Sequence, residues 1–182
     1  SLERAATAIK AAGLTDRITL KLIEPGPIPL SDDAFDIVVT KDVICHIPDK
    51  QSFFAEVFRV LRSGGIFASG DWIRGEEGSG TRVFNDWVEQ LRGLKFHFET
   101  VRAYVQALES VGFTQIESRD HSDWSERIAR QQLEDALGPA RETSIQTLGK
   151  EGYKKRTALT RARLEALSNR DLQHWHLRAS KP

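Results

Sequence analysis

The sequence predicts an α/β protein built on a parallel sheet, and three observations carry this prediction. An apolar run with β-branched residues (35–39) precedes an amphipathic helical pattern (50–62), and a second apolar run (66–69) follows it. Short runs of this kind are typical of strands buried on both faces of a sheet. A strand, a helix and a strand in this order form a parallel crossover, which is right-handed in nearly all known proteins.

Size and composition predict one domain. The chain has 182 residues and is 40% hydrophobic, which is enough for one sizeable core. Its 26 basic and 26 acidic side chains cancel, so its net charge favours neither nucleic acid nor a membrane as a partner, and we expect a small-molecule substrate. With a single cysteine, Cys45, no apolar run that could span a bilayer and no leader pattern, we expect a cytoplasmic protein.

The first elements are predicted from local pattern. Residues 2–12 alternate charge with alanine as a helix does, and Gly13 is placed to end it. Residues 18–23 alternate apolar and polar side chains as a short strand does. The proline-rich stretch 25–29 cannot continue a sheet because proline lacks the ladder donor, so a loop is expected there.

The crossover helix is predicted over residues 50–62. Apolar side chains recur on one side of it, and Gly64-Gly65 provides a stop: the apolar positions are Phe53, Phe54, Val57, Phe58, Val60 and Leu61. Residues 75–80 read as a linker, 81–92 and 99–111 as helices, and 114–119 as a strand. Residues 122–168 form helices broken near Gly138-Pro139 and at 149–152, and 172–179 form the last strand, so the doubly wound domain 1–182 carries a helical insertion or lid at 122–168.

The predicted topology places three loops where ligands bind. In an open parallel sheet, ligands collect beyond the carboxyl ends of the strands. The loops 24–30, 41–49 and 70–74 qualify, and folding is expected to bring their polar side chains to one rim, namely Glu24, Asp42, His46, Asp71 and Trp72.

Three segments resemble a known family. They are DAFDIVV at 33–39, DVICHIPDK at 42–50 and RVLRSGG at 59–65, and together they resemble class I S-adenosylmethionine-dependent methyltransferases of type 11. The Asp-x-x-x-His-Ile segment at 42–47 is similar to phosphoethanolamine N-methyltransferases, and LRASKP at 177–182 is similar to the closing strand of those enzymes. The resemblance implies a Rossmann-like fold and methyl transfer from S-adenosylmethionine to a small molecule, with an amine nitrogen as the expected acceptor.

The resemblance also identifies what this sequence lacks. Family members have a glycine-rich turn after the first strand, and no G-x-G-x-x-G occurs here, so the cofactor-binding segment is expected to be missing at the N-terminus. Glu24 and Pro25 lie where the family contacts adenine, but Pro25 has no N–H to donate. With Lys41, they are the cofactor-binding residues that the resemblance implies.

His46 and Asp42 are the predicted catalytic pair. Methyl transfer is an in-line displacement, so alignment and exclusion of water matter most. An amine must be neutral to attack, and a histidine can accept its proton near neutral pH. Asp42 would orient His46 or bind the ammonium group. The alternative is that His46 only packs the loop. Asp71 and Trp72 are predicted to contact substrate, although Asp71 could equally cap the turn that follows.

Other side chains carry weaker predictions. Four aromatic residues could cage a methylated ammonium group but are more often core: Trp72, Trp87, Tyr104 and Trp124. Basic residues on the insertion could meet a phosphate but are more often a solvated face: Lys154, Lys155, Arg156, Arg161 and Arg163. A nucleophilic role for Cys45 is discounted, no metal site is predicted, and the remaining histidines are assigned to structure.

Two alternatives to a methyltransferase stay open at this point. The chain could be a truncated, non-catalytic relative that keeps the fold and acts through a partner. A nicotinamide-dependent dehydrogenase is a remote alternative, because no dinucleotide fingerprint occurs in the sequence.

Overall fold

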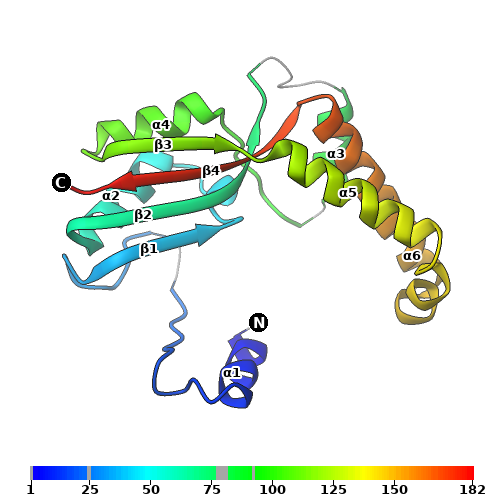
Figure 1. Cartoon of the computed structure of the whole chain (residues 1–182), viewed down its shortest axis with the longest axis horizontal. Coiled ribbons are helices and arrows are strands. Elements are labelled where there is room, and N and C mark those ends of the chain that lie inside the picture. Colours follow the sequence, from blue (N-terminus) through cyan, green and yellow to red (C-terminus); the bar gives the residue numbers. More distant parts are fainter. Residues whose placement is uncertain (1, 24–25, 77–81, 92) are drawn as a thin grey trace. The chain divides into compact units, whose positions relative to one another are not determined.

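A computed structural model describes residues 2–23, 26–76, 82–91 and 93–182 of the chain (Figure 1). The chain divides into two units, Ser1–Ser31 and Asp32–Pro182. The first unit contains helix α1 (Leu2–Ala11). The second contains, in chain order, β1 (Phe35–Lys41), the 3₁₀ helix η1 (Ile44–His46), α2 (Lys50–Val60), β2 (Leu61–Arg74), α3 (Arg82–Gln90), α4 (Val101–Ser110), β3 (Thr114–Asp120), α5 (Ser122–Leu137), α6 (Arg141–Ser168) and β4 (Leu172–Ser180).

The sheet of the second unit has the strand order β1-β2-β4-β3. β1 pairs parallel with β2, and α2 connects them, so the predicted crossover and the α/β class are confirmed. β4 lies between β2 and β3 and is antiparallel to both. Its register places His176 opposite Gly70 and His174 opposite Trp72.

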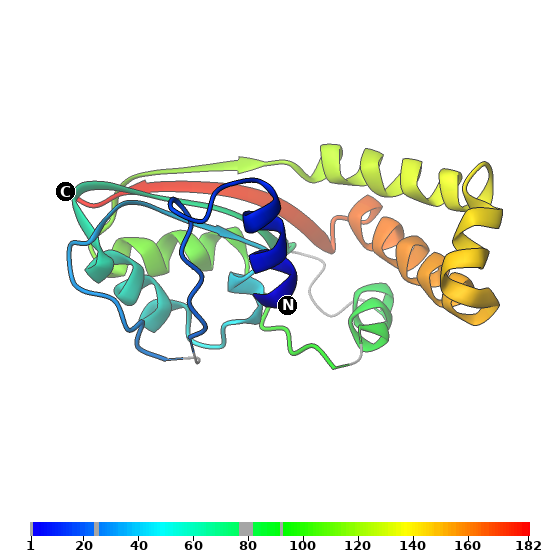
Figure 2. The same ribbon diagram turned by 90° about the horizontal axis from the view of Figure 1, so that it is seen from below.

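One face of the sheet is packed against α2 and α4, as Figure 2 shows. Alternate residues of β2, among them Phe67, Asp71 and Ile73, are buried, as expected for a strand with one covered face. They join apolar side chains of the helices in a core made of Ile44, Phe54, Val57, Leu61, Phe67, Ile73, Tyr104, Leu108, Phe113, Leu177 and Ala179.

A second apolar cluster joins the inserted helices to the end of the sheet. α5 packs along α6, and α3 packs against α6. The buried residues of this cluster are Phe84, Trp87, Ala129, Ala166, Leu167 and Leu172, with Trp72 packed beside them. The predicted breaks are present, because α5 ends at Leu137 and α6 is kinked at Gly149 (φ 71°, ψ 166°).

The opposite face of the sheet carries no helix of the described part of the second unit. Ile37 and Val39 on β1 are 57% and 69% exposed. The prediction that residues 35–39 are buried on both faces is therefore wrong for this unit, because α2 and α4 cover the sheet from one side.

In the first unit the helix is confirmed and the strand is not. Gly13 follows α1 with φ +67°, a left-handed conformation that suits glycine. Residues 18–23 are irregular, and Leu22 is 73% exposed. Alternation predicts which side chains share a face, but a strand also needs a neighbour to pair with, and the described part of this unit supplies none.

Two boundaries differ from the prediction. α2 ends at Val60, and Leu61 is already extended (ψ 138°), so the helix stops before the Gly64-Gly65 pair. Residues 70–74, predicted as a loop, are the last part of β2 and pair with β4. No helix within the described ranges is long and apolar enough to cross a membrane.

Candidate functional site

The candidate site forms where β1 ends. Asp42 follows the last strand residue with φ +53°, a left-handed conformation that aspartate tolerates better than most residues. The chain then makes the short helix η1 and reaches Asp49, which caps α2 by accepting hydrogen bonds from Ser52 N at 2.9 Å and Ser52 Oγ at 2.6 Å. The hydrogen bonds from Ser52 lower the pKa of Asp49, which keeps the cap ionised.

Asp71 of β2 binds the backbone of this loop. It is fully buried, and its carboxylate accepts hydrogen bonds from the N–H groups of Val43 (3.0 Å), Ile44 (2.7 Å) and Cys45 (3.1 Å). It also accepts one from Trp72 N at 2.8 Å. Asp71 therefore has a structural role, but it binds the loop at 43–45 and not a turn that follows it, since residues 72–74 belong to β2. The substrate contact expected for Asp71 stays a prediction.

A cavity of about 280 Å³ opens above the loop. It brings together the end of β1, the η1 turn, β2, α3 and the inserted helix α6. Its lining residues are Asp42, Cys45, His46, Trp72, Trp87, Leu91, Phe96, Arg156, Leu159, Thr160 and Arg163. Three of the four side chains predicted for catalysis and substrate contact, namely Asp42, His46 and Trp72, thus share one cavity.

The ring of His46 is held in a defined orientation. Its Nδ1 lies 2.8 Å from the carbonyl oxygen of Lys95, and its ring centroid lies 4.5 Å from that of Phe96. A carbonyl oxygen only accepts hydrogen bonds, so Nδ1 must carry the proton in the neutral ring. Nε2 then holds a lone pair and has no hydrogen-bond partner among the described residues. The neutral ring can therefore accept a proton from a ligand.

The described residues show no hydrogen bond between Asp42 and His46. The ring of His46 is oriented by the Lys95 carbonyl instead. Asp42 Oδ2 lies 3.6 Å from Lys41 Nζ, whereas Asp42 Oδ1 is buried without a hydrogen-bond partner among the described residues. A buried carboxylate oxygen without a donor is unfavourable unless a ligand supplies one. Of the two roles predicted for Asp42, this geometry favours binding a cationic group.

The aromatic lining comes from two of the four predicted cage residues. Trp72 and Trp87 line the cavity, together with Phe96. Tyr104 is fully buried in the core below the sheet, and burial raises the pKa of its phenol. Trp124 on α5 is largely exposed and lies outside the lining.

Two cations of the inserted helix reach the cavity. Arg156 and Arg163 line it, whereas the other three basic residues named from the sequence are exposed on α6: Lys154, Lys155 and Arg161. Arg163 Nη2 donates to Gln132 Oε1 at 2.5 Å, but its Nε is buried and has no acceptor in the part of the chain that the structure describes. Burial lowers the pKa of this guanidinium, and no ion pair joins either arginine to an acidic residue in the described ranges. The cavity therefore has an uncompensated positive side.

The remaining predicted site residues lie elsewhere. Lys41 is exposed beside Asp42 at the end of β1. Glu24 and Pro25 lie outside the described residues. The thiol of Cys45 is buried, and burial together with the charge of Asp71 raises its pKa, which disfavours the thiolate that a nucleophile needs.

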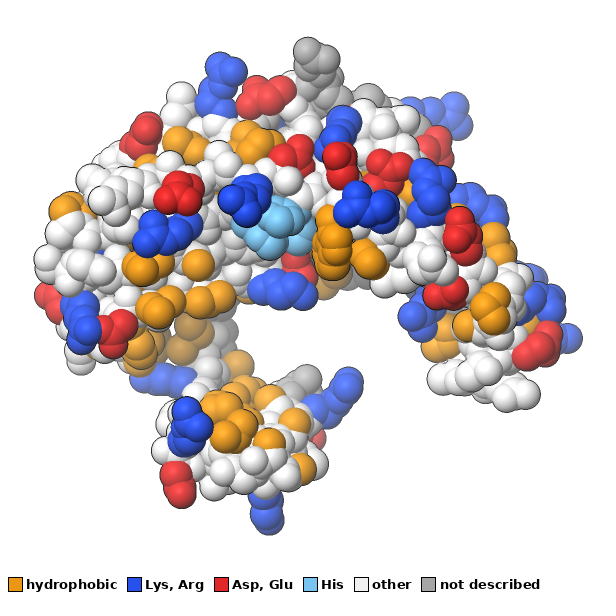
Figure 3. All heavy atoms as spheres, viewed as in Figure 1, with side chains coloured by type: hydrophobic (Ala, Val, Ile, Leu, Met, Phe, Trp, Pro, Cys, Tyr) orange, Lys and Arg blue, Asp and Glu red, His pale blue; other side chains and the backbone are white. Residues whose placement is uncertain are grey.

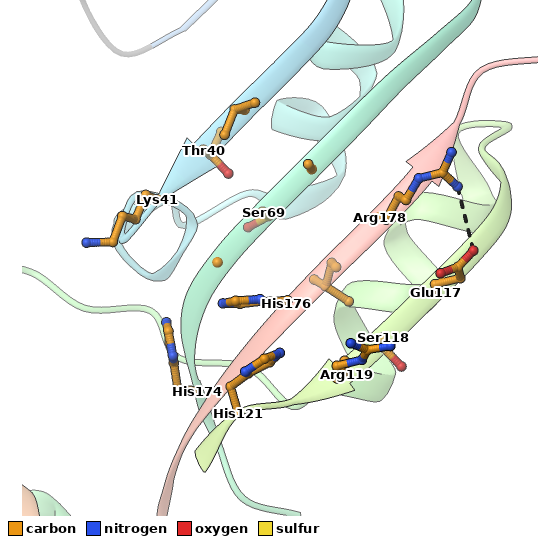
Figure 4. A pocket seen from close by; sticks show the side chains of 14 residues that line it. Thr40, Lys41, Ser69, Glu117, Ser118, Arg119, His121, His174, His176 and Arg178 are labelled. Atoms are coloured by element: carbon orange, nitrogen blue, oxygen red, sulfur yellow. Dashed lines mark ion pairs between the residues drawn. The ribbon is translucent and has the colours of Figure 1, made fainter. Parts of the chain in front are cut away.

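A second, more open cavity of about 860 Å³ lies on the uncovered face of the sheet (Figure 4). The rings of His121, His174 and His176 gather at one end of it, and His121 and His176 stack with centroids 3.9 Å apart. Figure 3 shows the histidine side chains beside Lys and Arg on this face. Among the described residues, no group of three or more His, Cys, Asp or Glu side chains is arranged to hold a metal ion. This histidine group was not expected from the sequence.

The sequence also did not identify Phe96, Leu159 and Thr160 as lining residues. For Phe96 a signal existed, since aromatic residues at 96 and 98 stand in a segment with no helical or strand pattern. For the α6 residues no signal existed, because only the docking of that helix brings them to the loop.

Comparison with known proteins gives a family match and several relatives. Residues 1–69 match a family model described as a methyltransferase domain. Phosphoethanolamine N-methyltransferase 1 of Arabidopsis thaliana is 28% identical over 168 residues, which cover 92% of this chain and 33% of that protein. Methyltransferase GfsG of Streptomyces halstedii is 30% identical over 153 residues, which cover 83% of this chain and 52% of that protein.

A solved structure shares the fold. Phosphoethanolamine N-methyltransferase 2 of Haemonchus contortus, in complex with phosphomonomethylethanolamine and S-adenosylhomocysteine, superimposes with a TM-score of 0.75 at 21% identity. The match covers 84% of this chain and 35% of that one. The chain spans about a third of the length of the Arabidopsis and Haemonchus proteins.

Proposed function

We propose that this chain, whose residues 1–69 match a methyltransferase domain model and whose sheet has the Rossmann-like class I methyltransferase fold, transfers a methyl group from S-adenosylmethionine to a small molecule. The acceptor that we propose is an amine that carries a phosphate group, of the phosphoethanolamine type. One observation carries this proposal: Asp42 and His46 share a small cavity with Arg156 and Arg163.

The end of β1 fits one part of the cofactor. Lys41 is exposed beside Asp42 at this strand end, and it is the residue that we expect to meet the carboxylate of the cofactor. When bound, the cofactor supplies the activated methyl group.

The cavity has the charges that a phosphorylated amine needs. Arg156 and Arg163 have no acidic partner within the described ranges and can bind a phosphate through charge-assisted hydrogen bonds. Asp42 can accept a hydrogen bond from the ammonium group. The rings of Trp72 and Trp87 can exclude water from the cavity. Their faces can also attract a methylated ammonium group through cation–π interactions.

His46 is the residue that we propose for proton transfer. Nδ1 donates to the Lys95 carbonyl, so Nε2 is the nitrogen that accepts the proton of the acceptor ammonium group. The neutral amine, held in line with the S–CH3 bond of bound S-adenosylmethionine, could then take the methyl group; S-adenosylhomocysteine would leave, and the methylated ammonium ion would be the product. No covalent bond to the protein is required, so the protein contributes alignment, proton acceptance and charge.

The test uses the full-length protein. Titration calorimetry should show saturable binding of S-adenosylmethionine and S-adenosylhomocysteine, and a methyl-transfer assay should show turnover with phosphoethanolamine. We expect His46→Gln to lower kcat by about 10²- to 10⁴-fold while cofactor affinity stays unchanged. His97→Gln is the matched control, because His97 is exposed on the segment that contacts His46.

The phosphate contact has its own test. Arg163→Gln should raise the KM for phosphoethanolamine by at least about tenfold and leave turnover of ethanolamine unchanged, since ethanolamine has no phosphate. Arg161→Gln, on the exposed side of the same helix, should change neither. If no cofactor binds to the intact protein, the enzyme proposal is overturned and the non-catalytic alternative is favoured.

A further inference from the structure

Lys50 is the first residue of α2 and is only 7% exposed. Its Nζ donates to the carbonyl oxygens of Ile47 at 2.5 Å and His97 at 2.6 Å, and it lies 5.5 Å from the ring centroid of Tyr104. No carboxylate lies within ion-pair distance of it in the described ranges. Its charge is therefore held chiefly by two peptide carbonyls.

This position is unfavourable for a lysine on two counts. Burial lowers the pKa of Lys50, although Glu99 and Asp71 partly oppose that effect. The N-terminus of a helix also has partial positive charge, which repels a cation. An apolar residue of similar length would avoid both penalties. It could not donate the hydrogen bonds that the ammonium group makes to the Ile47 and His97 carbonyls.

The carbonyls that Lys50 binds belong to the loop and to the segment that orients His46. The segment 95–98 has no helix or strand of its own. His97 N donates to Cys45 O at 2.7 Å, and His97 O accepts from Lys50, so this peptide is held on both sides. Two residues earlier, the Lys95 carbonyl oxygen accepts a hydrogen bond from His46 Nδ1.

We propose that Lys50 is a positioning residue: by binding the His97 and Ile47 carbonyls, its ammonium group fixes the segment whose Lys95 carbonyl holds His46 with Nδ1 protonated and Nε2 free. Asp71 fixes the N–H groups at the start of the same loop, so two buried charges secure it from both ends. The kinetic consequence rests on the proposed function, whereas the effect on the His46 ring does not.

The experiment measures the tautomer of His46 directly. In full-length protein with ¹⁵N-labelled histidine, long-range ¹H–¹⁵N correlation spectra distinguish a ring protonated at Nδ1 from one protonated at Nε2, and His46→Gln assigns the signal. We expect the neutral wild-type ring to be protonated at Nδ1. Lys50→Met should shift it to a mixture, and Lys50→Arg, which keeps a donor cation, should retain more of the Nδ1 form. Lys155→Met, at an exposed lysine, is the control.

Kinetics provide the second measurement. Lys50→Met should lower kcat about tenfold or more and change the acceptor KM less than threefold, because alignment is lost but the binding groups remain. If that variant does not fold, Lys50→Leu, which likewise has no donor, replaces it. A folded Lys50→Met or Lys50→Leu variant with the wild-type His46 tautomer would overturn the proposal. If the wild type transfers no methyl group but the tautomer responds, the positioning role stands and the proposed function fails.

Discussion

His174 and His176 lie two residues apart on β4, with ring centroids 5.4 Å apart. His174 is 6% exposed. Its Nδ1 lies 3.0 Å from Ser125 Oγ, and its Nε2 is buried with no partner within the described ranges. Burial, reinforced by the charge of His176, lowers the pKa of His174. Burial and the charges of His121 and Arg119 lower that of His176. Both rings therefore favour the neutral form in the folded chain.

These lowered pKa values make stability depend on pH. The unfolded chain binds protons at the ordinary histidine pKa of 6.5, and the folded rings bind them only at lower pH. Around and below pH 6.5 the unfolded state thus holds more protons at these two sites, so their contribution to the unfolding free energy falls as pH falls and is constant well above that value. The slope is at most about 1.4 kcal/mol per pH unit for each ring. Urea unfolding at pH 7.5, 6.5 and 5.5 measures it.

A double variant isolates the contribution of these two rings. His174→Gln with His176→Gln should flatten the dependence between pH 6.5 and 5.5, because neither glutamine titrates. His97→Gln, at an exposed histidine, should leave the wild-type slope. An unchanged slope in the double variant would show that other groups cause the dependence.

The sequence identified the cavity residues that lie near the strand ends, but not the cavity residues that the inserted helix α6 contributes. Asp42, His46 and Trp72 lie within or next to strand ends, where local pattern and motif predict a ligand rim. Arg163 is more than 90 positions away from all three, on a helix whose basic residues are more typical of a solvated face. Its place in the cavity depends on the packing of α6 against α3 and β4, which no local pattern encodes.

Sequence periodicity predicted the helices and strands that pack against other elements of the second unit. The helices over 99–111 and 122–168 and the strands over 114–119 and 172–179 are all present. The strand over 18–23 is absent because it has no neighbour to pair with. Residues 70–74 were assigned to a loop although β4 extends β2 through them, since pairing with a later strand determines where a strand ends.

The kink of α6 depends on the backbone conformation of Gly149. Gly149 adopts φ 71° and ψ 166°, a region that is essentially restricted to glycine, and no atom lies within 4 Å of the position that a Cβ would occupy. Gly149→Ala therefore meets no clash, and its cost is conformational, about 1–3 kcal/mol of unfolding free energy. Urea unfolding checks this value. Gln146→Ala, at an exposed position of the same helix, should change stability by less than about 0.5 kcal/mol. Equal stability of Gly149→Ala and wild type would mean that the helix can straighten.

For the second unit as a whole, the uncovered face of the sheet is the main departure from the predicted fold. Parallel sheets normally have helices on both faces, and the apolar pattern of residues 35–39 reflects that arrangement. In the described residues of this unit, α2 and α4 cover only one face, and β1 is an edge strand. The pattern thus predicts burial that this unit alone does not provide.

An exposed apolar edge strand should cause the 182-residue chain to self-associate. Ile37 and Val39 of β1 are exposed on the open face of the sheet. Because β1 is an edge strand, its unpaired backbone groups can also form hydrogen bonds with another chain. Sedimentation velocity over a range of concentrations should show reversible association. Ile37→Lys with Val39→Lys should weaken it at least about tenfold, because burying two charged side chains at a contact is unfavourable. Leu94→Lys is the matched control, since Leu94 is 59% exposed but lies outside the sheet. If Leu94→Lys weakened association equally, general surface charge and not the sheet edge would be responsible; a wild-type chain that is monomeric at all concentrations would show that the edge is protected.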